Sequence, residues 1–200
     1  MSKAKLAINW AASCGGCDMA ILELQEKILN VTEAFDIVFW PAAMDIKHKD
    51  VEAMEDKSID VCLFNGAIRS SENEHMAKLL RKKSKVLVAF GSCAHEGCIP
   101  GLANLNNKKE VFDYVYKETP STDNPNDYRP QTEYKVDEGT LKIPSFYDTV
   151  KTLGQTVEVD YYVPGCPPVA EQIWNAVEAI ISGNLPEKGS VVGAFSRTVC

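Results

Sequence analysis

The sequence predicts an α/β fold: a flavodoxin-like, doubly wound parallel sheet of about five strands with helices on both faces. Two observations predict it. Short β-type runs alternate with helical patterns along the chain, and such alternation is typical of parallel sheets. Hydrophobic residues make up 45% of the 200 residues, which is enough to bury a core. No internal repeat is evident, so we expect residues 1–200 to form a single domain.

The predicted strands are short apolar runs bounded by residues that interrupt a strand. Pro41 stops the second strand, Asn-Gly ends the third, and the fourth runs into Gly91. The strands are expected at residues 5–10, 35–41, 59–66, 85–93 and 156–165.

Between the strands, apolar residues recur at the spacing of amphipathic helices, as they do clearly in 18–30. The pattern in 72–84 follows Ser70 or Ser71 as candidate N-cap, and its basic last turn suits the helix dipole. Prolines open the last helix and Gly183 closes it. The helices are expected at residues 18–30, 49–56, 72–84 and 167–183.

Residues 104–156 do not follow this alternation. The stretch 119–139 is polar and contains prolines, and one helix is expected before it, at 109–118. Excursions of this length in a compact domain are usually functional or mobile. We expect this one either to cover a site or contact a partner, or to be a solvated variable loop.

Composition excludes several classes of function. A net charge of −7 and an isoelectric point near 5.1 argue against binding to nucleic acids or to anionic membranes. No apolar run approaches the roughly 20 residues of a membrane span. The amino terminus lacks an export signal, which predicts a cytoplasmic location. In such a protein, seven cysteines are expected to be buried, catalytic or metal-bound rather than disulfide-bonded.

Four cysteines follow predicted strands. Cys14 and Cys17 come after the first strand, Cys93 after the fourth and Cys166 after the fifth. Because parallel strands all end at one edge of the sheet, topology alone brings these thiols to the same edge, although Cys14 and Cys166 are 152 positions apart. Glycines in these turns allow the backbone to approach a bulky ligand. The helix that begins after Cys17 favours a negatively charged one.

Four interpretations compete for these cysteines. A thioredoxin-type dithiol explains Cys14 and Cys17 but gives no role to the other two. A structural zinc site usually takes two close pairs, and only one close pair exists here. Burial as small hydrophobic side chains suits Cys62, in the middle of the third strand, but not cysteines in glycine-rich turns. An iron–sulfur cluster held by four unevenly spaced cysteines fits best.

Three motifs resemble those of a known family. "CGGC" after the first strand, "GSCA" followed by "IPGLANL", and "VPGCPP" before a helix resemble the small subunit of nickel–iron hydrogenases, especially the cytoplasmic, methyl-viologen-reducing type found with heterodisulfide reductase. The matching segments lie within about 5–105 and 155–185. The related 20 kDa-type subunit of respiratory complex I shares the last two motifs. It has adjacent cysteines after its first strand, which favours the hydrogenase branch.

The resemblance implies that Cys14, Cys17, Cys93 and Cys166 hold a proximal [4Fe-4S] cluster. It also implies a large subunit that carries nickel and iron, and a downstream heterodisulfide-reductase-like or other iron–sulfur or flavin protein. The chain would then relay electrons in an oxidoreductase complex and would have no catalytic residue of its own. Two alternatives are a subunit of a complex-I-like redox assembly that does not handle hydrogen, and a structural metal module without electron transfer.

Further residues are candidates near the cluster. Some oxygen-tolerant hydrogenases carry an extra cysteine at the offset of Cys98, but their second extra cysteine stands where this chain has Gly16. The resemblance therefore implies an ordinary cubane with Cys98 nearby. Glu96 and His95 could tune the cluster, although we expect His95 to be a loop residue. Cys200 would be a ligand of a second cluster if the chain is a fragment, and a terminal thiol if the subunit is a shortened one.

Overall fold

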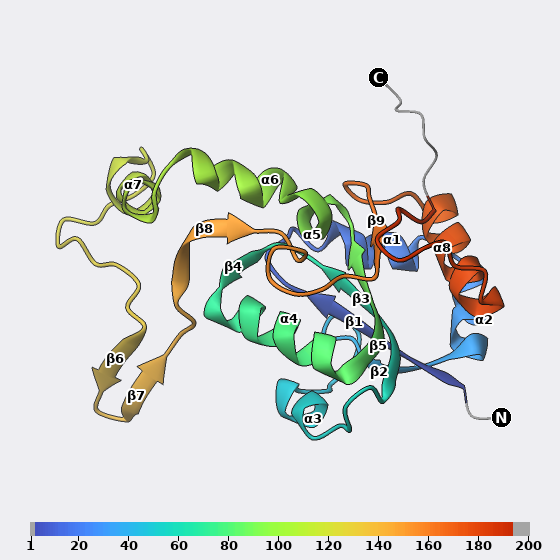
Figure 1. Ribbon diagram of the computed structural model, residues 1–200. Coiled ribbons are helices and arrows are strands. Elements are labelled where there is room, and N and C mark those ends of the chain that lie inside the picture. The colour runs from blue at the N-terminus through green and yellow to red at the C-terminus, as the bar shows by residue number, and fades with distance from the viewer. Residues whose placement is uncertain (1–2, 194–200) are drawn as a thin grey trace.

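The computed structural model describes residues 3–193, and their centre is a parallel sheet (Figure 1). In chain order its strands occupy positions 2-1-3-4-5, the flavodoxin-like arrangement, so the predicted fold class is confirmed. The order reverses between β1 and β3, which is where folds of this type bind ligands. Across the sheet the strands are β2 (Phe35–Phe39), β1 (Ala4–Trp10), β3 (Ile59–Asn65), β5 (Ser84–Phe90) and β9 (Tyr161–Val163).

Helices cover both faces of this sheet. One face is covered by α1 (Gly16–Leu22), α2 (Lys27–Ala34) and α8 (Ala170–Ser182). The other is covered by α3 (His48–Glu52) and α4 (Ser71–Lys83).

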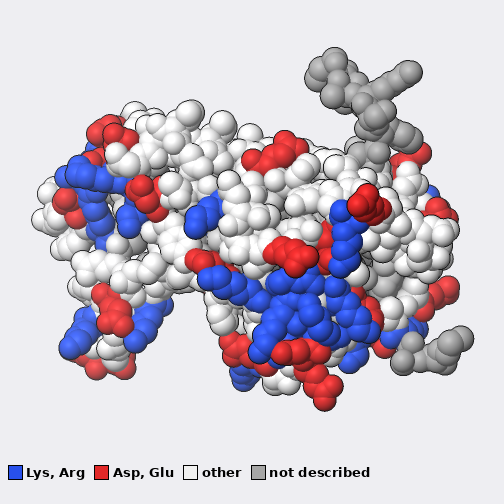
Figure 2. Space-filling view, viewed as in Figure 1, with Lys and Arg blue, Asp and Glu red and all other residues white. Residues whose placement is uncertain are grey.

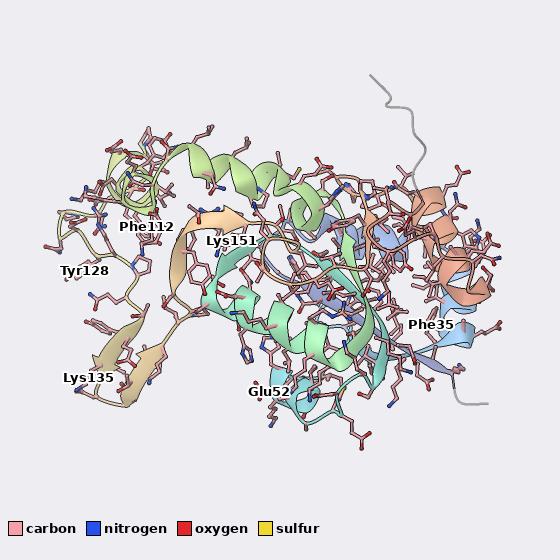
Figure 3. All side chains as sticks on the ribbon, viewed as in Figure 1. Phe35, Glu52, Phe112, Tyr128, Lys135 and Lys151 are labelled. Atoms are coloured by element: carbon pink, nitrogen blue, oxygen red, sulfur yellow. The ribbon has the colours of Figure 1, made fainter. Side chains whose placement is uncertain are left out.

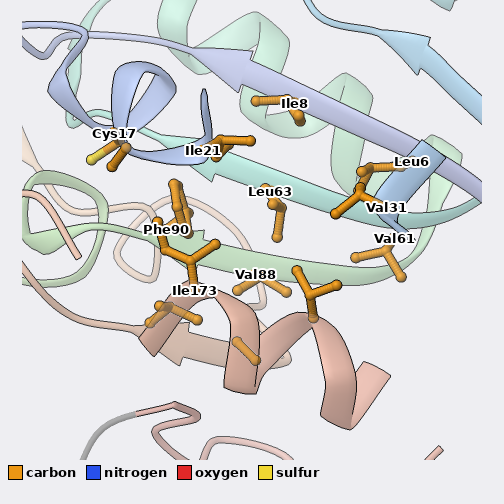
Figure 4. Packing of buried hydrophobic residues seen from close by; sticks show 14 of the residues in the cluster. Leu6, Ile8, Cys17, Ile21, Val31, Val61, Leu63, Val88, Phe90 and Ile173 are labelled. Carbon is orange, nitrogen blue, oxygen red and sulfur yellow. The ribbon is translucent and has the colours of Figure 1, made fainter. Parts of the chain in front are cut away.

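Side chains alternate between two hydrophobic cores, as the period of a strand requires. On β5, Val88 and Phe90 face α1 and α8, whereas Leu87 and Ala89 face α4. Figure 4 shows Ile173 of α8 packed with Phe90 and Val88 in the first core. Both cores consist mainly of apolar side chains, and their burial is the main stabilisation of the sheet.

The ends of two helices agree with the sequence. Ser70 caps α4, and its Oγ accepts a hydrogen bond from the backbone N–H of Asn73 at 3.3 Å. The last turn of α4 is basic, as predicted. Gly183, with φ 70°, ends α8 in the left-handed conformation that glycine adopts easily. This helix begins at Ala170 rather than at 167, because Pro167 and Pro168 precede it.

Three predicted elements differ in length, among them the helix expected at 49–56, which is present as α3 but ends at Glu52. The helix expected at 18–30 is divided into α1 and α2, and Gln25 in the break has φ 53°. The break lets Ile21 and Val31 reach the same core, and no glycine or proline marks it in the sequence. The fifth strand is only three residues long, since the chain before Tyr161 packs as loop against the second core.

More secondary structure follows β5 than the sequence indicates. Three short elements form a rod along one edge of the molecule: α5 (Ser92–Glu96), α6 (Cys98–Gly101) and the 3-10 helix η1 (Leu102–Leu105). The helix expected at 109–118 is present as α7 (Lys108–Asp113), which continues as a π-helical turn η2 (Tyr114–Glu118).

The remainder of the excursion contains strands that its polar composition did not predict. β6 (Glu133–Val136) and β7 (Gly139–Lys142) form an antiparallel hairpin whose residues are all exposed. β8 (Phe146–Lys151) returns to the domain and pairs antiparallel with β4 (Ile68–Ser70). Figure 3 shows Tyr128 and Lys135 far from the sheet, on the arm that carries this hairpin.

Charge is unevenly distributed over the surface. On the face shown in Figure 2, cations gather over the end of α4, and the surface along α6 carries few charges. The cations line a hollow and comprise Lys57, Lys78, Arg81, Lys82, Lys85 and Lys188. In the part of the chain that the structure describes, no helix is both long and apolar enough to cross a membrane.

Candidate metal centre

The cysteine turns lie at the carboxyl ends of three strands. Cys14 precedes α1, and Cys17 lies in its first turn, directly after β1. Cys93 is in the first turn of α5, after β5, and Cys166 follows β9. The sheet thus brings to one edge the residues that the sequence places far apart.

The cysteine turns lie close together. A Cβ added at Gly91, two residues before Cys93, would overlap the Sγ of Cys17, and a Cβ added at Gly16 would lie 3.9 Å from Pro167, the residue after Cys166. Burial is the main cause that raises the pKa of Cys17 to about 12, and the nearby Cys93, Cys14 and Cys166 contribute to this rise. Burial is also the main cause that raises the pKa of Cys93 to about 11, with contributions from Cys98, Cys166 and Cys14.

This environment suits sulfur ligands for a cationic centre. Cys17 and Cys93 are each 7% exposed, whereas Cys14 and Cys166 are exposed. Thiols with raised pKa values stay protonated unless a positive charge compensates the thiolates, and a bound metal deprotonates them outright. Four cysteines are also the usual ligand set of an iron–sulfur cluster, so the residues present fit that group.

Within residues 3–193, no three His, Cys, Asp or Glu side chains are grouped as a single metal ion would require.

Glycines make room around the sulfur atoms. Gly91 has φ 83°, and a Cβ added there would overlap the Sγ of Cys17. A Cβ at Gly16 would lie 3.3 Å from the Sγ of Cys14, and the Gly16 N–H donates to that sulfur at 3.4 Å. A side chain at position 91 would thus displace the thiol of Cys17, and the backbone N–H of Gly16 is a hydrogen-bond donor to the thiol of Cys14.

Cys98 lies beside the four thiols, as the resemblance implies. It is half-buried, and it is among the causes that raise the pKa values of Cys93 and Cys166. Its hydrogen bond and its charge are the main reasons why the pKa of Cys166 is raised. Cys98 has φ 40°, a left-handed conformation that is strained for any residue other than glycine.

Two other candidates, His95 and Glu96, follow Cys93 on α5, and the remaining cysteines lie in the core or outside the described residues. The ring of His95 packs on Tyr162 with centroids 4.7 Å apart, and its Nδ1 lies 3.4 Å from Oε1 of the exposed Glu96. Cys62 is completely buried in the core below α4, where burial raises its pKa to about 12. Cys200 is outside the residues that the structure describes.

Sequence reasoning missed one residue at this edge, Asp18. Its side chain is buried, and Oδ1 accepts from Trp40 Nε1 at 2.7 Å while Oδ2 accepts from Asn65 Nδ2 at 2.6 Å. Ser13 Oγ in turn donates to Asn65 Oδ1 at 2.8 Å. A signal did exist: Asp18 stands three residues before Ile21, on the buried face of α1.

The profile of the family described as NADH ubiquinone oxidoreductase, 20 Kd subunit, matches residues 14–180. The chain is 50% identical over 197 residues to the iron-sulfur subunit of an F420-non-reducing hydrogenase from Archaeoglobus profundus, and the match covers 98% of this chain and 61% of that protein. It is 36% identical over 183 residues to a subunit of an F420-non-reducing hydrogenase from Methanocaldococcus jannaschii, covering 92% and 58%. The chain thus spans about six tenths of the length of these curated relatives.

A similar fold is known from experiment. A chain in the crystal structure of an NAD+-reducing [NiFe]-hydrogenase in the H2-reduced state matches with a TM-score of 0.78 and 27% sequence identity. The match covers 93% of this chain and 95% of that one, so the likeness extends over nearly the whole of both chains.

Proposed function

Since the chain belongs to the NADH ubiquinone oxidoreductase, 20 Kd subunit family, we propose that it is the electron-transfer subunit of a nickel–iron hydrogenase complex. In this proposal Cys14, Cys17, Cys93 and Cys166 hold one [4Fe-4S] cluster. Electrons pass through the chain between a nickel–iron large subunit and downstream iron–sulfur or flavin carriers. The observation that carries the proposal is the convergence of these cysteine turns at the carboxyl edge of the sheet.

The comparisons support the hydrogenase branch of the family. The two relatives named above are hydrogenase subunits, and one is described as an iron-sulfur subunit. The matching crystal structure is also a hydrogenase. The C-x-x-C spacing of Cys14 and Cys17 supports the same branch on independent grounds.

The residues of this chain would hold and shield the bound group. When bound, a cluster of this kind supplies one-electron transfer, which needs neither a nucleophile nor a general base. Cys17 and Cys93 are withdrawn from solvent, which limits access of water to their side of the site. Gly16 donates its N–H to the sulfur of Cys14, and hydrogen bonds to ligand sulfurs are among the features that set a cluster's potential.

The surface beside the cysteines supports docking of a large subunit there. Exposed apolar side chains stand on the elements that carry the thiols, and the surface along α6 has few charges in Figure 2. Exposed apolar residues gathered on one side of a protein are typical of interaction sites. They are Met19 and Leu22 on α1, Ile99 and Leu102 on the rod after Cys93, and Val169 after Cys166.

A second candidate function is a cluster-bearing subunit of a complex-I-like assembly that does not handle hydrogen, and the description of the family favours it. Both functions require the same four ligands. They differ in the partner, because a hydrogenase large subunit must hold nickel and iron. Metal analysis of the purified complex separates them: nickel in the partner supports the hydrogenase, and a partner without nickel supports the alternative.

The ligands are tested by Cys93→Ser in the complex purified without oxygen. We expect the variant to lose about four irons per chain, together with the electron paramagnetic resonance signal of one reduced cluster. Cys166→Ser provides a second test at an exposed position, and Cys62→Ala is the matched control because that thiol is buried in the core below α4. A Cys93→Ser complex with full iron content and signal, or a wild-type chain that holds zinc and no iron, contradicts the proposal.

A further inference from the structure

Asp18 is a buried carboxylate without a compensating cation. Its side chain belongs to a residue that is 3% exposed, and both of its oxygens accept hydrogen bonds from neutral donors, Trp40 Nε1 and Asn65 Nδ2. Over the described range 3–193, no Lys, Arg or His forms an ion pair with it. Proteins rarely bury a carboxylate in this way, because removing an unpaired charge from water is unfavourable.

The hydrogen-bonded group links three strand ends beneath the cysteine turns. Trp40 follows β2, Asn65 ends β3, and Ser13 lies in the turn after β1, where it donates to Asn65. Asp18 itself is the neighbour of Cys17 on α1, and its charge is among the causes that raise the pKa of Cys17. The carboxylate is therefore fixed in position, and its charge acts on the neighbouring thiol of Cys17.

We propose that Asp18 is a fixed negative charge that lowers the reduction potential of the cluster, and that Trp40 and Asn65 are its positioning residues. The proposal rests on the proposed function, since it assumes that Cys17 is a ligand. Reduction adds one electron to the cluster, and a neighbouring negative charge makes that addition less favourable, most strongly where water is excluded. Neutral donors hold the carboxylate in place without cancelling its charge, which Lys or Arg would do.

The Asp18→Asn substitution removes the charge and can keep every hydrogen bond. The new side chain has one acceptor oxygen and one NH₂ group that carries two N–H donors. Its oxygen can still accept from Trp40 Nε1. If the amide of Asn65 turns over, Asn65 Oδ1 accepts from the new NH₂ group, and Asn65 Nδ2 donates to Ser13 Oγ. The shape and the network are then retained, so a change of potential reports the charge.

The test is a redox titration of the cluster in the intact complex, followed by electron paramagnetic resonance. We expect Asp18→Asn to keep the wild-type iron content and to have a more positive midpoint potential. At the wild-type midpoint, the ratio of reduced to oxidised cluster should rise about tenfold, which is about 59 mV for one electron. An Asp18→Asn midpoint equal to or below that of the wild type overturns the proposal.

Two further variants separate charge from structure. Asp160→Asn is the matched control, a buried carboxylate at the opposite edge of the sheet, and should leave the midpoint unchanged. Trp40→Phe keeps the charge of Asp18 but removes one donor, so the midpoint should fall. A merely structural role predicts shifts of the same sign for Asp18→Asn and Trp40→Phe. Trp40→Phe also decides the question if Asp18→Asn fails to assemble, because an unchanged or raised midpoint overturns the proposal.

The two levels of inference fail differently. If the wild-type complex shows no reducible iron–sulfur signal, the proposed function fails and this inference with it. If the wild type shows the signal and the midpoint does not respond to Asp18, only the role of Asp18 is wrong.

Discussion

Two buried aspartates at opposite edges of the sheet have contrasting surroundings. Asp160, before β9, accepts from Arg81 at 2.5 Å, from Lys188 at 2.6 Å and from the N–H of Leu87 at 2.8 Å. Asp18, at the carboxyl edge, has only the neutral donors Trp40 and Asn65 among the described side chains. The buried charge of Asp160 is therefore compensated by cations, whereas the buried charge of Asp18 is not.

Backbone strain does not separate the two edges, but ion pairs do. Cys98 beside the thiols and Lys57 before β3 both have positive φ. At the amino edge, α4 ends in a basic turn whose Lys82 and Lys83 both pair with Asp56. The comparison teaches that this fold pairs its charges at the amino ends of its strands. It tolerates an uncompensated charge at the carboxyl ends, where a group can be held.

Replacing Gly91 should have the largest effect at the cysteine edge. A Cβ there overlaps the Sγ of Cys17, and φ 83° is strained for alanine. Gly91→Ala should lower the free energy of unfolding by about 2–6 kcal/mol, from about 1–3 kcal/mol each for strain and overpacking. It should also reduce the iron content. Denaturant unfolding and iron analysis measure the two effects.

Gly101→Ala is the matched control for this change. Gly101 has no atom within 4 Å of a Cβ and does not have positive φ. The control should therefore stay within about 0.5 kcal/mol of the wild type. If the two variants had the same stability and iron content, the cysteine edge would not require glycine at position 91 for steric reasons.

At the opposite edge, Asp160→Asn should reduce stability by about 2–4 kcal/mol, because it leaves the largely buried Arg81 without its partner. Burial on its own raises the pKa of Asp160. The hydrogen bonds from Lys188, Arg81 and the Leu87 N–H outweigh burial, so the pKa is lowered overall.

The sign of the pH dependence follows from the lowered pKa of Asp160. The stabilisation is present above the unfolded pKa of about 3.9 and is lost as pH falls through the lower folded pKa. Urea unfolding at several pH values should show the gap between wild type and Asp160→Asn narrowing below about pH 4. A gap that stays constant or widens in acid would show that the ion pair is not its source.

Replacing Cys98 should change the free energy of unfolding least among these variants. Cys98→Gly relieves the positive φ and should raise the free energy of unfolding by about 0.5–1 kcal/mol, the strain less the entropy of glycine. Cys98→Ala keeps the strain and should show no such gain. Both variants should retain the wild-type iron content if the cluster has four ligands. A loss of iron in both would make Cys98 a ligand instead.

The sequence was sufficient for features that depend on local pattern. The strands could be predicted because each is a short apolar run, and parallel topology then implied where Cys14, Cys93 and Cys166 would lie. The break near Gln25 could not be predicted, since no residue there disfavours a helix and the cause is packing of both halves on one core. The hairpin of β6 and β7 was missed because none of its residues is buried.

The surroundings of Asp18 were beyond local pattern for a different reason. Its two donors are 22 and 47 residues away along the chain, just after β2 and at the end of β3, which lie on either side of β1. A polar residue on the buried face of a helix can be recognised from spacing alone. Its partners can be named only once strand order and register are known, because those decide that Trp40 and Asn65 meet beneath α1.

The delivery of distant thiols by strand order also has a consequence for biogenesis. Cys14 and Cys166 are 152 positions apart, so at ordinary rates of translation about 8–30 s separate their emergence from the ribosome. Cys93 is made within that interval, but the set of four thiols stays incomplete until β9 and Cys166 join the sheet. Under the proposed function, we therefore expect iron delivery to act only after the last strand has been placed.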